Sequence, residues 1–86
     1  MPVVSMFFGI VIRMYYQGHG PAHFHAEYSG RGAVFDMTGA LLRGDLGSRR
    51  AARLVRIWAR ENRARLESNW RRAAAGEPLL PIPLLE

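Results

Sequence analysis

The spacing of the apolar residues changes halfway along the chain, and this change constrains the fold more than any other feature. Residues 9–43 form short β-branched and aromatic runs that are separated by turns rich in glycine and proline. From Ser48 onward, Ala51, Leu54, Val55 and Trp58 recur at helical spacing and form one apolar stripe. A sequence that places its strands first and its helices afterwards predicts an α+β fold.

The strand half predicts a three- or four-stranded antiparallel β-meander. Strands are expected over residues 9–16, 23–28 and 33–37, with a short fourth over 40–43. The segments 17–21 and 29–32 between them contain the glycines and the proline of turns. Residues 23–28 alternate cleanly, which predicts one apolar and one polar face.

The helical half is expected to pack on the apolar face of this sheet. Ser48 is a suitable N-cap. Leu66 and Trp70 leave the apolar stripe by roughly a quarter turn at about 100° per residue, so a break is expected near Asn62. We therefore predict a helical hairpin or one kinked helix.

The length of 86 residues allows one domain, residues 1–86. It divides into a β-meander (1–45), a helical part (47–75) and an extended apolar tail (76–86) that follows Gly76 and contains three prolines. The tail is expected to pack on its own chain, and the alternative is a contact in a homodimer or with an antitoxin-like partner.

Several functional classes are excluded or disfavoured by composition. The chain has no cysteine, so it has neither disulfides nor thiolate metal ligands. No run approaches the roughly 20 apolar residues that span a bilayer, and the first residues do not resemble a signal peptide. We therefore expect a cytoplasmic protein without a membrane partner.

The best candidate for a functional site is a histidine cluster, because His19, His23 and His25 fall within seven residues. On a strand, His23 and His25 project from one face, and Glu27 follows them on the same side. If the apolar faces of the first two strands match, Arg13 and Tyr15 lie beside this group. The predicted face therefore combines imidazoles, a carboxylate, a guanidinium and a phenol.

Three interpretations of this face remain open. The histidines could simply be solvated residues on an exposed sheet face. His19, His23 and His25 could bind zinc or another divalent transition metal, since imidazole is a good ligand for these ions. The third interpretation is metal-free cleavage of RNA, which needs no cofactor: His23, His25 or Glu27 would transfer protons, and Arg13 would stabilise the charge that develops on phosphorus.

A second candidate surface is an arginine stripe along the predicted helices. All twelve basic residues of the chain are arginines, and the net charge is +5. The members of the stripe are three or four residues apart: Arg49, Arg53, Arg56, Arg60 and Arg63. The stripe is either a solvated helix face or a binding surface for an anionic partner, which would be nucleic acid or an acidic protein.

The opening MPVVSMFFGIVIRMYYQGHGPAHFHAEY resembles the signature of a bacterial family, domain of unknown function 4160. Trp58 and the pair Asn69-Trp70 match the helical part of that family. Members are often encoded beside another small protein, of the family domain of unknown function 2442, in an arrangement like a toxin–antitoxin pair. The resemblance therefore implies a basic component of such a pair, which binds or cleaves RNA and has a small acidic antitoxin-like partner. A metal-binding protein and an interaction module without catalysis remain the alternatives.

Overall fold

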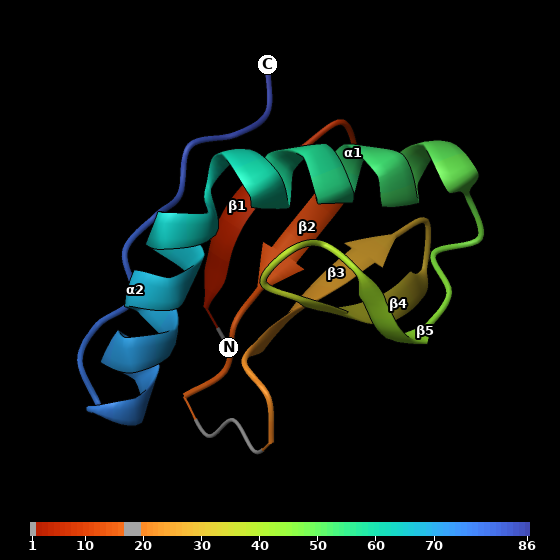
Figure 1. Cartoon of the computed structure of the whole chain (residues 1–86). Helices are drawn as coiled ribbons and strands as arrows, with labels where there is room; N and C mark the ends of the chain where they lie inside the picture. The colour runs from red at the N-terminus through yellow and green to blue at the C-terminus, as the bar shows by residue number, and fades with distance from the viewer. Residues whose placement is uncertain (1, 17–19) are drawn as a thin grey trace.

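The computed structural model describes residues 2–16 and 20–86. It contains one antiparallel sheet followed by two helices, as Figure 1 shows. The strands are β1 (Val3–Phe7), β2 (Ile10–Arg13), β3 (His23–Tyr28), β4 (Arg31–Asp36) and β5 (Leu41–Gly44). Each strand pairs with the next in the chain, in the order β1-β2-β3-β4-β5. The helices are α1 (Arg49–Glu61) and α2 (Arg63–Ala74). The predicted α+β meander is confirmed, and it has five strands.

The additional strand is β1, which the sequence analysis did not anticipate. Two features of the sequence hide it. A bulge between Val3 and Ser5 interrupts the alternation of buried and exposed residues. The turn to β2 consists of Phe8 and Gly9, both with positive φ (49° and 79°), and phenylalanine is not a residue that signals such a turn.

The helix boundaries follow the expected signals. The Ser48 hydroxyl accepts a hydrogen bond from the Ala51 N–H at 3.0 Å and caps α1. The helical path breaks at Asn62, whose backbone leaves the helical region with φ −120° and ψ 23°. The Asn62 side-chain amide donates to the Trp58 carbonyl oxygen at 3.0 Å, which stabilises the end of α1. The predicted break is therefore confirmed.

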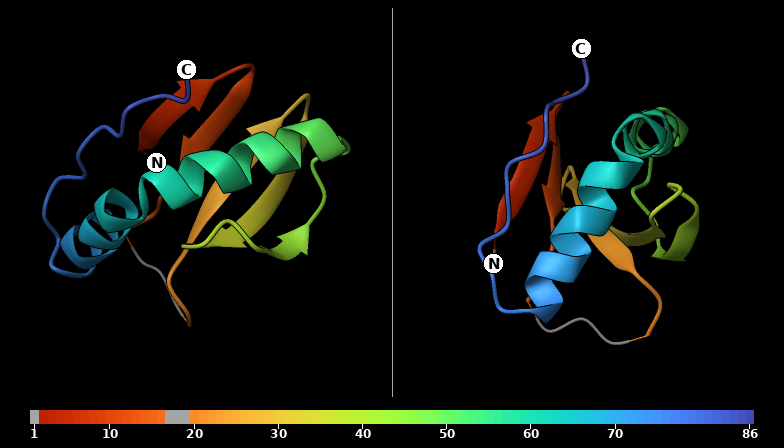
Figure 2. Two further views of the ribbon diagram at one scale, coloured as in Figure 1. Left: turned by 45° about the horizontal axis from the view of Figure 1, so that its top comes forward. Right: turned by 60° about the vertical axis from the view of Figure 1, so that its left-hand side comes forward.

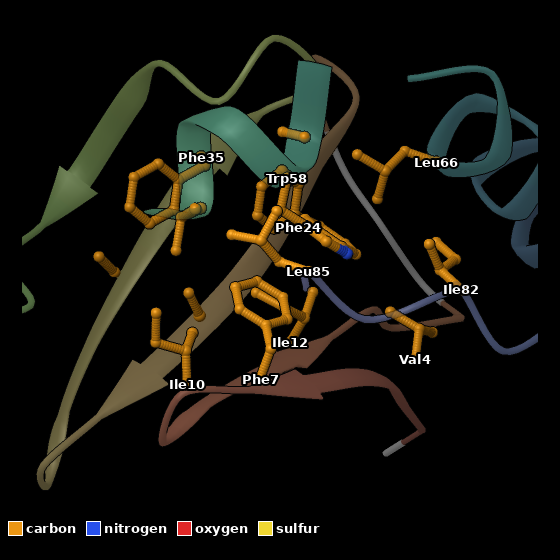
Figure 3. Packing of buried hydrophobic residues seen from close by; sticks show 14 of the residues in the cluster. Val4, Phe7, Ile10, Ile12, Phe24, Phe35, Trp58, Leu66, Ile82 and Leu85 are labelled. Carbon is orange, nitrogen blue, oxygen red and sulfur yellow. The ribbon is translucent and has the colours of Figure 1, made fainter. Parts of the chain in front are cut away.

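The core lies between α1 and one face of the sheet (Figures 1 and 2). Trp58 of α1 is fully buried and contacts Phe7 and Phe24, with ring centroids 5.4 and 5.6 Å away (Figure 3). Phe24 also stacks on Phe35 at 5.7 Å. Truncating an aromatic residue in such a position costs about 3–5 kcal/mol. Among the described residues, neither helix lies across the opposite face of the sheet, which α2 meets where Trp70 contacts His23.

The tail packs along β1 and α2 of its own chain (Figure 2). The Ile82 N–H donates to the Val4 carbonyl oxygen at 2.7 Å, so the tail covers the outer edge of the sheet at β1. Trp58 Nε1 donates to the Pro83 carbonyl oxygen at 2.9 Å. Ile82 and Leu85 are buried within the chain, which agrees with the first of the two interpretations of the tail.

Candidate functional site

The open face of the sheet carries the residues that the sequence predicted to lie together. We call this surface the imidazole face and define it by Arg13, Tyr15, His23, His25 and Glu27. It exists because strand residues alternate: Phe24 and Ala26 of β3 face the core with no exposed area, and their neighbours point the other way. The register of β2 and β3 places Arg13 directly opposite His25. The predicted matching of the two strands is therefore confirmed.

Arg13 and Glu27 form an ion pair on this face. Arg13 Nε donates to Glu27 Oε2 at 3.0 Å, and the two side chains are 30% and 47% exposed. A pair so accessible to water contributes at most about 1 kcal/mol to stability. It nevertheless restrains the Arg13 guanidinium on this face, on the strand position opposite His25.

His25 lies at the centre of the imidazole face. Its ring meets the Tyr15 ring edge-on, with centroids 4.4 Å apart, and the His23 ring lies 5.4 Å away. Burial lowers the pKa of His25 below its ordinary value of 6.5, and the neighbouring charges of His23 and Arg43 lower it further, against the opposing effect of Glu27. His25 is therefore a neutral imidazole at pH 7, able to accept a proton.

His23 is fixed by contacts on two sides. Its Nδ1 lies 2.9 Å from the Pro21 carbonyl oxygen, and because a carbonyl only accepts, Nδ1 carries the proton. Nε2 is then the ring nitrogen left to exchange a proton. The other contact is with the Trp70 ring of α2, whose centroid lies 5.1 Å away. Both contacts restrict how the His23 ring can turn.

An open hollow of about 460 Å³ lies over these rings. It is lined by Tyr15, Tyr16, His23 and His25. Two phenols, the neutral imidazole of His25 and the oriented imidazole of His23 therefore meet there. Aromatic surfaces of this kind are suited to stacking against planar groups.

Two residues of the site were not among the predicted ones. Trp70 was recognised only as an apolar helix residue, and its contact with His23 depends on the packing of α2. Arg43 of β5 lies opposite Val34, which in turn lies opposite His25 across β4. A register shift between Val34 and Phe35 sets this alignment, and no local signal in the sequence marks it.

Of the predicted metal ligands His19, His23 and His25, the first lies outside the described residues. Among residues 2–16 and 20–86, no group of three histidine, aspartate or glutamate side chains is arranged to hold a metal ion. His23 and His25 are close enough for two ligands of one ion, because imidazole nitrogens bind zinc at about 2.0–2.1 Å. A third ligand is what the metal interpretation still requires.

The arginine stripe lies on the opposite side of the molecule from the imidazole face. Its first four members are exposed on α1, on the side of the helix away from the buried Ala51, Val55 and Trp58. Within the described part of the chain, Arg49, Arg53, Arg56 and Arg60 form no ion pair. Arg63 begins α2 and pairs with Glu67 at 3.1 Å.

This separation has a direct consequence for binding. The core side chains of α1 face one side of the sheet, and the imidazole face is the other side. A small ligand on the imidazole face therefore cannot reach the stripe. The two predicted surfaces serve different ligands, or different parts of one large ligand.

Fold and site together define a small basic α+β protein that carries an imidazole-rich patch on the open face of a β-meander. The family described as Domain of unknown function (DUF4160) matches residues 9–71 of the chain. The chain therefore belongs to this family, as its resemblance indicated. No curated protein and no solved structure gives a significant match. In the described ranges, neither helix is long and apolar enough to cross a membrane.

Proposed function

We propose that this chain binds RNA on its imidazole face and cleaves it without a metal, as the basic component of a toxin–antitoxin-like pair. One observation carries this proposal: His25 is a neutral imidazole held between Tyr15 and His23, and Arg13 lies directly opposite it on β2. This combination offers a base, a second imidazole and a positive charge within one patch. Cleavage of RNA at its 2′-hydroxyl requires those three functions.

In this proposal each residue of the imidazole face has one role. His25 takes the proton of the 2′-hydroxyl, and the 2′-oxygen forms a bond to phosphorus. The bond from phosphorus to the 5′-oxygen breaks, and His23 in its imidazolium form donates a proton from Nε2 to that oxygen. The products are a 2′,3′-cyclic phosphate and a 5′-hydroxyl. Arg13 stabilises the charge on the phosphoryl oxygens, and Glu27, paired with Arg13, holds that guanidinium in place.

The test is cleavage of a short single-stranded RNA in the presence of EDTA. The His25→Ala variant is expected to lose activity by a factor of about 10²–10⁴, the usual contribution of one acid or base. Expression of the wild type is expected to arrest growth, and His25→Ala to relieve the arrest. Arg31→Gln, on an exposed residue at the start of β4, is a control for the loss of one positive charge. Equal cleavage or equal arrest by wild type and His25→Ala would refute catalysis and leave an interaction module.

The arginine stripe is our proposed site for the second component of the pair, a small acidic protein. Four exposed arginines in a row without a carboxylate partner among the described residues form a surface that an acidic partner complements. Arg53→Glu together with Arg60→Glu is expected to abolish binding of that partner. The same double variant should leave RNA binding on the imidazole face intact, because the two surfaces are on opposite sides.

A metal site is the second candidate, and the hydrogen bond of His23 favours it. Metal-ligating histidines commonly donate their other ring N–H to a carbonyl, as His23 Nδ1 does to Pro21. The test is elemental analysis of protein purified without an affinity tag. Near-stoichiometric metal that is lost in the His23→Ala/His25→Ala variant supports this candidate. Absence of metal after incubation with zinc would eliminate it.

A further inference from the structure

A second, smaller hollow lies beside the first and shares two of its lining residues, Tyr15 and His25. Its volume is about 160 Å³, and it extends across β3, β4 and β5. Its lining includes Tyr15, His25, Glu27, Val34 and Arg43. The hollow is not filled by side chains of β4, because Gly32 has no side chain and Val34 is almost completely buried. At about 30 Å³ per water molecule, the hollow has room for roughly five waters.

Arg43 is the cation of this hollow with an uncommitted guanidinium. It is exposed on β5, and it forms no ion pair or hydrogen bond with the rest of the described chain. Arg13, by contrast, is paired with Glu27, and this ion pair offsets part of the negative charge that Glu27 brings to the lining of the hollow. The Arg43 charge acts at His25, since it is one of the causes that lower the pKa of that imidazole. An anion placed between the two residues would therefore be attracted by Arg43 and could accept a hydrogen bond from His25.

Tyr15 and His25 line both hollows. The larger hollow is lined by aromatic rings, including Tyr16, which is 44% exposed. The smaller one has a largely apolar lining, into which Arg43 brings an uncommitted guanidinium and His25 an imidazole. Aromatic rings suit a nucleobase, and a guanidinium fork suits a phosphate.

We infer that Arg43 and His25 form a phosphate subsite in the smaller hollow, next to a base subsite formed by Tyr15, Tyr16 and His23. This inference rests on the proposed function and deepens it, because it states which part of a single-stranded RNA lies where. A base stacks in the larger hollow, and a neighbouring phosphate lies across the His25 ring, beside Arg43. The sheet thus binds one nucleotide through an aromatic subsite for the base and a charged subsite for the phosphate.

The experiment is an NMR titration with three probes: inorganic phosphate, uridine and uridine monophosphate. Phosphate alone is expected to shift the His25 ring and Arg43 Nε–H signals, and uridine alone the signals of Tyr15, Tyr16 and His23. Arg43→Gln should weaken phosphate binding about tenfold or more, because it removes a charge-assisted hydrogen bond to the phosphate. Uridine binding should not change. Arg43→Lys should restore part of the phosphate affinity, and Arg31→Gln is the matched control.

The outcomes separate this inference from the proposed function. If phosphate binds equally to wild type, Arg43→Gln and Arg31→Gln, it is an adventitious ion only and the subsite is refuted. If a short RNA binds on the imidazole face but Arg43→Gln binds it as tightly as Arg31→Gln does, the subsite fails and the proposed function stands. If phosphate binding depends on Arg43 while RNA does not bind the imidazole face, the proposed function fails and the anion subsite stands.

Discussion

Asn69 provides the sharpest test of how the tail is held. This residue of α2 is 1% exposed, and its amide forms two hydrogen bonds with the backbone of Leu80. Asn69 Nδ2 donates to the Leu80 carbonyl oxygen at 2.8 Å, and the Leu80 N–H donates to Asn69 Oδ1 at 2.9 Å. The Asn69 side chain therefore pairs with both backbone groups of Leu80, as a residue of a neighbouring β-strand would. Asn69→Ala removes both bonds and leaves the Leu80 backbone without partners in a partly buried position.

The expected loss follows from these contacts. Each hydrogen bond contributes about 1 kcal/mol net, and unpaired backbone groups add to the cost, so Asn69→Ala should lower the free energy of unfolding by about 2–4 kcal/mol. A chain of this length has a total stability of about 4–13 kcal/mol, from roughly 0.05–0.15 kcal/mol per residue. The variant should therefore lose a large fraction of its stability. Ser68→Ala, one residue earlier and half-buried, is the control and should change stability by no more than about 0.5 kcal/mol.

Urea unfolding, followed by the fluorescence of Trp58 and Trp70, measures the effect. At about 1–3 kcal/mol per molar of urea, the midpoint for Asn69→Ala should fall by on the order of 1–3 M. Hydrogen exchange at the Leu80 and Ile82 amides should accelerate in the same variant, since both amides are hydrogen-bonded in the tail. If Asn69→Ala and Ser68→Ala have the same midpoint, the amide does not hold the tail and the reasoning is wrong.

Three further predictions concern stability. Burial and neighbouring positive charges lower the pKa of His25 below 6.5, so as pH falls the His25 imidazole is protonated in the unfolded chain before it is protonated in the folded one. The free energy of unfolding should therefore rise with pH up to about 6.5. His25→Gln should flatten that rise in urea titrations. Gly39→Ala should cost at least about 2 kcal/mol more than Gly30→Ala, because both glycines have positive φ but only at Gly39 would a Cβ meet a backbone atom, Arg56 Cα at 2.6 Å; equal midpoints would contradict this contact. Ser5→Ala should raise the Tm by about 4 °C or more, since the buried Ser5 Oγ has no hydrogen-bond partner in the described structure, and a lower Tm would show that the hydroxyl is needed.

Much of the fold could be predicted because it depends on patterns that span only a few residues of the sequence. The alternation of residues 23–28 identifies which side chains face the core, since the pleat of a strand has a period of two. The Ser48 cap and the break at Asn62 depend on residues within one or two helical turns. β1 could not be predicted in the same way, because its bulge and the Phe8-Gly9 turn remove both local signals.

The candidate site was predicted to the extent that it lies on neighbouring strands. Arg13, Tyr15, His23, His25 and Glu27 share a face because the apolar residues of β2 and β3 must both face the core. Arg43 was not predicted, because a register shift between β4 and β5 decides which residue of β5 is aligned with His25. The contact of Trp70 with His23 depends in the same way on how α2 packs.

The sequence by itself determined the order of strands and helices, the two faces of the meander and the residues of the imidazole face, because periodicity and capping act over a few residues. Only the tertiary structure decided that the tail covers the edge of β1, that Arg43 is aligned with His25 across β4, and that the arginine stripe lies on the far side from the imidazole face. Each of these depends on strand register or on packing between segments far apart in the chain. Such contacts are selected by the fit of whole surfaces, which no short stretch of sequence specifies.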